Sequence, residues 1–180
     1  MKLSLEKTIF ITLTVLLLAG CKKNYIISDK QAILFQFEYV NYAWGYQHNG
    51  FFIDNSGNVL TYSNPEVWNF PDNDFTLTES QVSENIGSCI HTGKKIPLEE
   101  LQKYTHFINN IALSKVTALK NVAADAGSSE YICYQFSESR VTYKGFIIKM
   151  EGDFTCENLN FHSKKVAAWM KDISNSIKAN

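Results

Sequence analysis

The amino-acid sequence predicts an α+β domain in which a single antiparallel β-sheet packs against two to three helices. Short segments rich in β-branched and aromatic residues, bounded by turn residues, occur before residue 63 and again at residues 130–150. Elsewhere, apolar residues recur at the spacing of an amphipathic helix. Strands joined by short turns pair antiparallel, so we expect a meander and a C-terminal hairpin in one sheet. These elements form one domain over residues 31–180.

The start of this domain is typical of a three-stranded meander. Residues 33–40 alternate in part, which predicts a strand with one face formed by Ile33, Phe35, Phe37 and Tyr39. Asn49-Gly50 favours the positive φ angles of a hairpin turn, and residues 51–53 follow as the second strand. A second turn is expected at residues 54–57 and a third strand at residues 58–62.

Two helices are expected in the middle of the chain. Thr78 and Gln81 have the spacing of a capping box, which predicts a short helix over residues 79–86. Residues 87–95 are then a connection. Apolar side chains recur at helical spacing over residues 97–111, where a proline suits the first turn.

The C-terminal part combines a hairpin with a helix. Residues 112–128 fit either a strand or a helical turn, and their structure stays undecided. Residues 130–136 and 140–150 predict two antiparallel strands. One apolar stripe along residues 166–177 predicts a C-terminal helix that covers the sheet.

The composition excludes several partners. The formal net charge is −1 at pH 7, so there is no basic field to attract nucleic acid. Arg140 is the only arginine, and bidentate recognition of phosphates or bases depends on arginine. We therefore expect neither nucleic acid nor nucleotide as a partner.

The first 21 residues have the parts of an export signal. Two lysines precede residues 8–18, an uncharged apolar run of 11 residues. That run is too short for a membrane-spanning helix, which needs about 20 apolar residues. Small residues follow at positions 19 and 20, as a processing site requires. The sequence Leu18-Ala19-Gly20-Cys21 resembles the lipobox of bacterial lipoprotein signal peptides.

The resemblance implies that residues 1–20 are a signal peptide and that lipid is attached to Cys21. Residues 21–30 are then a lipidated cysteine with a tether, and the membrane is an expected partner. Position 22 is Lys rather than Asp, which by similarity to enterobacterial sorting rules favours the outer membrane over the inner one. The globular part is expected outside the cytoplasm, in the bacterial cell envelope. The alternative is a secreted protein in which Cys21 is incidental.

Three thiols remain after Cys21. An extracytoplasmic compartment permits disulfides, and Cys133 and Cys156 flank the predicted hairpin, so they are the favoured pair. The alternative is that no bridge forms. Cys89 and His91 add further zinc-ligand types, but no two ligands have the spacing of a local pair. We expect no metal site.

Other segments approach known motifs and fail. Residues 87–94 have five residues between their glycines where a phosphate loop has four, and a second lysine stands where that loop has Ser or Thr. Residues 54–58 and 72–74 supply oxygens but lack the later bidentate Glu of a calcium loop. Asx turns explain both segments. No cofactor is expected.

Catalytic patterns are also missing. Nothing resembles the Gly-x-Ser-x-Gly elbow of a hydrolase. Glu151 and Asp153 share a strand face, but a strand end that runs into solvent explains them. The four histidines are scattered along the sequence and are expected to be exposed: His48, His91, His106 and His162. These observations predict that the protein is not an enzyme.

Aromatic residues supply the best candidate for a functional surface. They concentrate around residues 39–52 and in the polar loop 64–75. Tyr39, Trp44 and some phenylalanines are expected in the core, since core packing is the commonest fate of such residues. Tyr and Trp left exposed would suit the binding of a protein or glycan. The candidate binding residues are Tyr42, Trp44, Tyr46, Trp68 and Phe70.

These expectations combine into one functional hypothesis. The lipobox and the missing catalytic motifs predict a membrane-anchored envelope lipoprotein that acts as a non-catalytic binding module. Its partner would be an envelope protein or a glycan. One alternative is an inhibitor or immunity lipoprotein that neutralises an envelope-acting hydrolase or toxin, by analogy with other small tethered domains. The other is an envelope enzyme, which would need a cleft where a histidine meets a carboxylate and a nucleophile.

Overall fold

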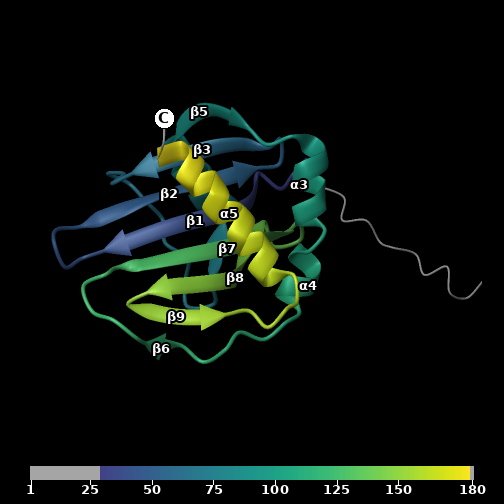
Figure 1. Ribbon diagram of the computed structural model, residues 1–180. Helices are drawn as coiled ribbons and strands as arrows, with labels where there is room; N and C mark the ends of the chain where they lie inside the picture. The colour runs from purple at the N-terminus through teal and green to yellow at the C-terminus, as the bar shows by residue number, and fades with distance from the viewer. Residues whose placement is uncertain (1–28, 179–180) are drawn as a thin grey trace, which may run out of the picture.

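The structure is a computed structural model that describes residues 29–178. The predicted α+β class is confirmed, because a nine-stranded antiparallel sheet packs against helices (Figure 1). Along the sheet the strands follow the order β5-β3-β2-β1-β7-β8-β9-β6, and β4 pairs with β8. The strands are β1 (Ile33–Asn41), β2 (Gln47–Asp54), β3 (Asn58–Ser63), β4 (Thr76–Thr78), β5 (Ile90–Lys95), β6 (Lys120–Asn121), β7 (Ser128–Ser137), β8 (Thr142–Gly152) and β9 (Phe154–Glu157).

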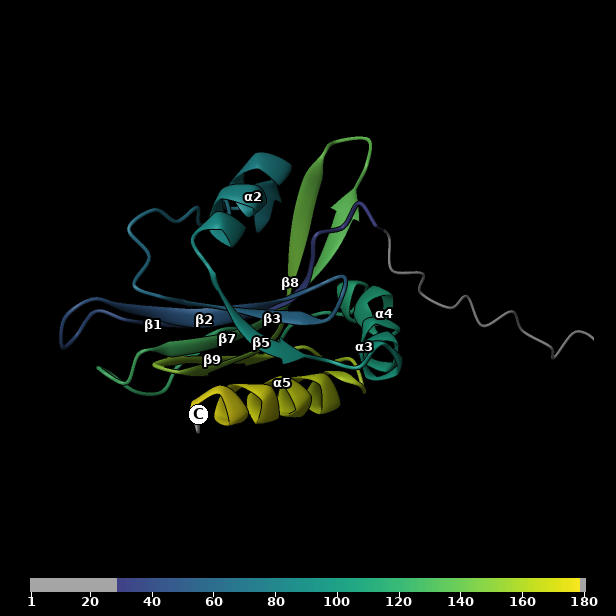
Figure 2. The same cartoon turned by 90° about the horizontal axis from the view of Figure 1, so that it is seen from above.

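Helices cover both faces of the sheet (Figure 2). On one face, here the α5 face, α5 packs against a core that includes Phe35, Phe37, Phe51, Ile148 and Met170. On the opposite α2 face, α2 covers a second core that includes Phe52, Leu60, Leu77, Val82 and Ile132. The helices are α2 (Glu79–Gly87), α3 (Leu98–Thr105), α4 (Ile108–Ala112) and α5 (Ser163–Lys178). None of the helices within residues 29–178 combines the length and apolarity needed to cross a membrane.

Strand β1 does not keep the single face that its alternation predicts. Phe35 and Phe37 pack in the α5-face core as expected, with Tyr39 against it. Ile33 packs instead in the α2-face core. The register against β2 shifts between Ile33 and Phe35, and such a bulge adds one residue and reverses the side-chain alternation.

The predicted turn at Asn49-Gly50 is wrong, because both residues lie inside β2. Asn49 pairs with Tyr39 and Gly50 with Glu38, so the chain reverses earlier, between Asn41 and Gln47. Gly50 is needed here for space rather than for turn geometry. A Cβ atom at this position would lie 2.1 Å from the carbonyl oxygen of Phe37 and 2.4 Å from the hydroxyl of Tyr62.

One of the predicted helices is interrupted, and the others form as expected. The capping box between Thr78 and Gln81 is present at the start of α2, as expected. The helix expected over residues 97–111 is divided into α3 and α4. At the break, the amide of Phe107 donates to the carbonyl of Tyr104, a tighter turn than that of an α-helix. Both helices still direct apolar side chains into the α5-face core.

Two connecting segments become strands. Within the segment 87–95, expected as a connection, residues 90–95 form β5, which pairs with β3 at one edge of the sheet. Within the undecided segment 112–128, residues 120 and 121 form β6, which pairs with β9 at the other edge. Both edge pairings join segments far apart in sequence, so local patterns did not reveal them.

The expected disulfide between Cys133 and Cys156 is not formed, and this prediction is wrong. Both are free buried thiols, on β7 and β9 respectively, and β8 lies between these strands. Two strand spacings amount to about 10 Å, whereas bridged cysteines have Cα atoms within about 7 Å. Burial in the core raises the pKa of the Cys133 thiol, which keeps it protonated and inert.

The crowding at Gly50 gives a direct test of the β2 register. Gly50→Ala is expected to lower the free energy of unfolding by about 1–3 kcal/mol, because the new methyl group must displace Phe37 or Tyr62. Gly87→Ala is the matched control, since nothing lies within 4 Å of a Cβ atom there. Urea denaturation of both variants provides the measurement. Equal stability of the Gly50 variant and the wild type would contradict this register.

Candidate functional site

The candidate site lies on the α2 face, at the end of the sheet where the β1–β2 hairpin projects (Figures 1 and 2). A pocket of about 530 Å³ is present there. Strands β1 and β7 form its floor, the hairpin and the 64–75 loop one side, and the residues around Asp125 and Asp153 the other. All of its lining residues are described, and none of them is basic. Among them are Glu38, Tyr42, Phe70, Asp125, Glu130, Asp153 and Phe154.

A buried hydrogen-bond network underlies the floor of this pocket. The Tyr134 hydroxyl donates to Oε1 of Gln36 at 2.5 Å, and Nε2 of Gln36 donates to the Tyr62 hydroxyl at 3.0 Å. Tyr62 in turn donates to the carbonyl oxygen of Phe37. Burying such polar groups is tolerated only when they bond to one another, and here each tyrosine and the glutamine has a partner.

His48 lies beside this network, at a place that the sequence did not predict. It was predicted to be exposed, but its side chain is 0% exposed. Its Nε2 atom lies 2.6 Å from Oε1 of Glu38. The ring is enclosed by four aromatic rings whose centroids lie 5.1–6.1 Å away, those of Tyr46, Tyr62, Trp68 and Phe70. The histidine therefore holds the Glu38 side chain in place from within the protein, and it does not line the pocket.

The second ring nitrogen of His48 has no partner. Among the described residues, Nδ1 is the one buried side-chain nitrogen or oxygen that makes no hydrogen bond. Leaving a buried polar atom unpaired costs about 1–3 kcal/mol. The 2.6 Å contact with Glu38 offsets part of this cost, since a hydrogen bond to a carboxylate is stronger than one between neutral groups.

Glu38 faces a second carboxyl group across the strands. Glu130 of β7 is its direct partner in the antiparallel register, and both line the pocket. Burial, and then the charge of Glu38, raise the pKa of Glu130 to about 7. Two carboxyls this close resist joint ionisation. Glu130 therefore changes its protonation near neutral pH.

The two aspartates on the other side of the pocket have different roles. Both oxygens of Asp153 accept hydrogen bonds from backbone amides, those of Ala126 at 2.9 Å and Gly127 at 3.0 Å. Gly127 has φ +72°, and a Cβ there would lie 2.8 Å from the Tyr39 hydroxyl. Asp153 thus fixes the turn that forms this side of the pocket. Asp125, in the same turn, is exposed.

Four of the five predicted binding residues reach the surface, and two of these, Tyr42 and Phe70, line the pocket. Trp44 is 79% exposed, which corrects the expectation that it belongs to the core. Tyr42, Tyr46 and Phe70 are also exposed, and Tyr42 and Tyr46 pack together with ring centroids 5.4 Å apart. Trp68 differs, because it is partly buried against the α2-face core. Trp68 therefore lies beneath the exposed aromatic residues and packs on the core rather than being available to a partner.

The sequence analysis did not identify the polar residues of the site as functional candidates. Glu38 and Gln36 interrupt an otherwise apolar strand on alternate positions, and this was the available signal for a polar patch on one face. Glu130 and His48 meet Glu38 only through strand pairing, and no local spacing reveals that.

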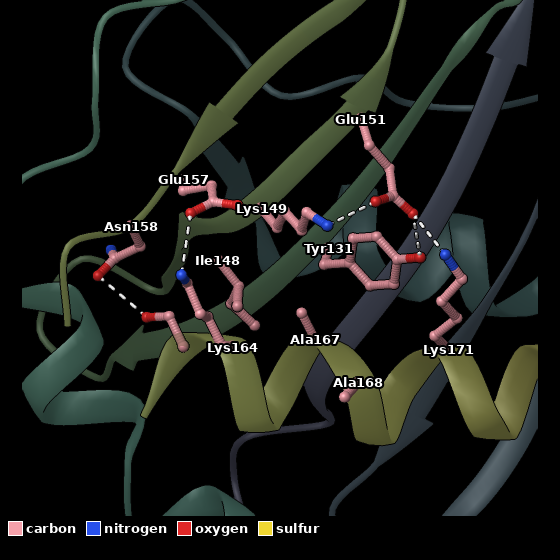
Figure 3. A pocket seen from close by; sticks show the side chains of 11 residues that line it. Tyr131, Ile148, Lys149, Glu151, Glu157, Asn158, Lys164, Ala167, Ala168 and Lys171 are labelled. Atoms are coloured by element: carbon pink, nitrogen blue, oxygen red, sulfur yellow. Dashed lines mark hydrogen bonds and ion pairs between the residues drawn. The ribbon is translucent and has the colours of Figure 1, made fainter. Parts of the chain in front are cut away.

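A second pocket, of about 310 Å³, lies between α5 and strands β8 and β9 (Figure 3). Glu151 binds Lys149 at 2.6 Å, Lys171 at 3.1 Å and the Tyr131 hydroxyl at 3.1 Å. Although burial alone raises the pKa of Glu151, hydrogen bonds from both lysines hold it below its ordinary value. The expectation that Glu151 simply runs into solvent is therefore wrong. Two lysines therefore compensate the charge of Glu151, whereas no lysine or arginine lines the acidic pocket.

The other motifs behave as ordinary turns. Asp54 accepts hydrogen bonds from the amides of Ser56 and Asn58, and Asp72 from those of Asp74 and Thr76, as expected for Asx turns.

Across the part of the chain that the structure describes, no three His, Cys, Asp or Glu side chains converge closely enough to hold a metal ion.

The comparisons with known proteins give no relative. No protein-family model, no curated protein and no solved structure matches the chain.

The raised pKa of Glu130 predicts a pH-dependent stability. Between pH 4.5 and about 7 the folded protein keeps a proton that the unfolded chain releases, so stability falls as pH rises through this window. Glu130→Gln is expected to remove this loss. The variant should match the wild type at pH 4 and exceed its unfolding free energy at pH 8 by on the order of 2–3 kcal/mol.

Urea denaturation at pH 4, 6 and 8 measures the difference between variant and wild type. Glu99→Gln, on the exposed first turn of α3, is the matched control and should follow the wild type at each pH. A difference for Glu130→Gln that stays constant from pH 4 to pH 8 would contradict the raised pKa.

The two tryptophans of the predicted surface should differ in what they contribute to folding. Trp68→Ala is expected to cost about 3–5 kcal/mol, because its ring stacks on Phe52 at a centroid distance of 5.5 Å. Trp44→Ala is expected to change stability by less than about 0.5 kcal/mol, because its ring is exposed. Thermal unfolding of both variants provides the measurement. Equal losses of stability in the two variants would contradict the exposed position of Trp44.

Proposed function

We propose that this protein is a lipid-anchored cell-envelope lipoprotein that acts as a non-catalytic binding module. The observation that carries the binding role is the juxtaposition of exposed aromatic rings with an acidic pocket that no basic residue lines. Exposed Tyr and Trp at a pocket are enriched in binding surfaces because they bury much area at little entropic cost. The lipid anchor rests on the lipobox at Cys21, which lies outside the described residues.

The charge of the pocket narrows the choice of partner. Glu38, Glu130, Asp125 and Asp153 line it, and no basic residue accompanies them. A positively charged group would relieve the repulsion between Glu38 and Glu130 and could also stack on an aromatic face of the rim. The partner is therefore a protein segment that presents lysine or arginine, rather than a neutral glycan.

Crosslinking in the cell envelope tests this role. A benzophenone-bearing amino acid in place of Trp44 should capture the partner in cells, because position 44 is exposed at the tip of the hairpin. The same amino acid in place of Ile90, also exposed but on the edge strand β5, is the matched control. A product seen at position 44 alone, and lost in Tyr42→Ala, supports the surface. Equal products at both positions would reject it.

The identity of the captured protein separates the two binding roles. An envelope hydrolase or a toxin would favour the inhibitor or immunity function, and an acidic pocket is complementary to a basic catalytic cleft or nucleic-acid-binding face. Capture of any other envelope protein would favour the general binding module over the inhibitor or immunity function.

An enzyme is the second candidate, and one observation favours it. Glu130, with a pKa raised to about 7, faces Glu38 in a pocket, and a carboxyl group whose pKa lies near neutral pH is suited to general acid–base catalysis. Hydrolysis of envelope polysaccharide by the wild type that is lost in Glu130→Gln, with folding retained, would select this function over the binding module.

A further inference from the structure

The end of the molecule opposite the β1–β2 hairpin carries a second exposed apolar surface. Phe161 is 90% exposed and Leu113 87%, the highest values among the described large hydrophobic residues. Leu159 adds a side chain that is 65% exposed. These three residues, together called the apolar end, lie just after α4 and just before α5. They are absent from both hydrophobic cores.

Hydrogen bonds join the two segments that carry these side chains. The amide of Leu159 donates to the carbonyl oxygen of Lys115 at 2.9 Å, and Nδ2 of Asn160 donates to that of Asn110 at 3.3 Å. Buried Asn158 donates from Nδ2 to the carbonyl oxygens of Ile111 and Ile147. The backbone is therefore fixed, and the apolar side chains project from a rigid base rather than from a loose loop.

The charges around the apolar end are mainly positive. Lys115, Lys164 and Lys165 are exposed on the same two segments. Glu157 is the neighbouring carboxylate, 3.9 Å from the ammonium group of Lys164, with both side chains open to solvent. An ion pair of this kind contributes little and leaves Lys164 able to bind elsewhere. Exposed Phe and Leu flanked by lysines are the composition of surfaces that bind anionic lipid.

The position of the apolar end agrees with a membrane contact. The described chain begins beside the β7–β8 hairpin, where Lys30 binds Glu138 at 2.7 Å, and this is the end of the molecule at which α4 lies and α5 starts (Figure 2). The β1–β2 hairpin lies at the opposite end (Figures 1 and 2). Cys21 precedes Asp29 by eight residues, which span at most about 30 Å. A lipid on Cys21 would hold this side of the domain close to the bilayer.

We propose that the apolar end docks on the anionic surface of the bilayer to which Cys21 is anchored. Phe161, Leu113 and Leu159 enter the boundary between headgroups and acyl chains, and the three lysines meet the lipid phosphates. The domain then stands with its hairpin and acidic pocket directed away from the membrane. This inference rests on the lipid anchor of the proposed function and is independent of what the acidic pocket binds.

Fluorescence quenching by brominated lipids tests the docking. The full chain, processed in a bacterium and reconstituted into vesicles of phosphatidylglycerol and phosphatidylcholine brominated near the headgroup, is compared with Phe161→Trp. The emission added by Phe161→Trp is expected to be quenched by at least half. Ile90→Trp is the matched control, exposed on the edge strand β5, and its added emission should remain unquenched. Replacing Lys115, Lys164 and Lys165 together by Glu in Phe161→Trp should reduce the quenching at least twofold.

Each other outcome decides against the docking. Unquenched emission from Phe161→Trp in a chain whose Cys21 is lipidated by mass spectrometry would overturn the docking alone. Quenching of wild-type emission that disappears in Trp44→Phe would put the hairpin on the membrane instead. A concentration-dependent blue shift of Phe161→Trp in detergent without vesicles would assign the apolar end to a second copy of the chain. An unmodified Cys21 would overturn the anchor and the docking together.

Discussion

The buried carboxylate of Glu38, on the central strand β1, constrains much of the surrounding structure. β1 lies between β2 and β7 and has packed side chains on both faces. Glu38 is only 7% exposed and Gln36 4%, so their polar groups need partners within the protein. Neighbouring strands supply the partners instead: His48 from β2, Tyr62 from β3 and Tyr134 from β7. A side chain at position 50 would clash with Tyr62, so glycine there is part of the same arrangement.

This constraint also gives the pocket its chemistry. His48 fixes one oxygen of Glu38, and the strand register brings Glu130 opposite it. Burial then makes full ionisation of the pair unfavourable. The groove beside α5 differs, because Lys149 and Lys171 already neutralise Glu151. No lysine or arginine lines the pocket of Glu38 and Glu130, so a ligand that brings positive charge gains more there than beside Glu151.

The two exposed surfaces lie at opposite ends of the sheet, and their compositions differ. The hairpin end is rich in Tyr and Trp beside carboxylates, whereas the apolar end has Phe and Leu beside lysines. Amphipathic aromatic rings suit a protein partner, and purely apolar side chains with ammonium ions suit anionic lipid. A domain held by a short tether would use one end to set its orientation and the other to meet its partner.

The sequence by itself determined the elements with strong local signals. Alternation in β1, the Thr78–Gln81 capping box and the apolar stripe of α5 each depend on neighbouring residues, and they are enough for the α+β class. The candidate binding aromatics were also identified from the sequence, and the lipobox, outside the described residues, stays a prediction.

Tertiary structure decided which strands pair and which side chains meet. Asn49-Gly50 has the composition of a turn, but pairing with β1 and packing against Tyr62 place it inside a strand. Cys133 and Cys156 flank β8 in sequence, and that intervening strand keeps them apart. The meeting of Glu38, His48 and Glu130 depends on strand register, a long-range property that no local spacing encodes.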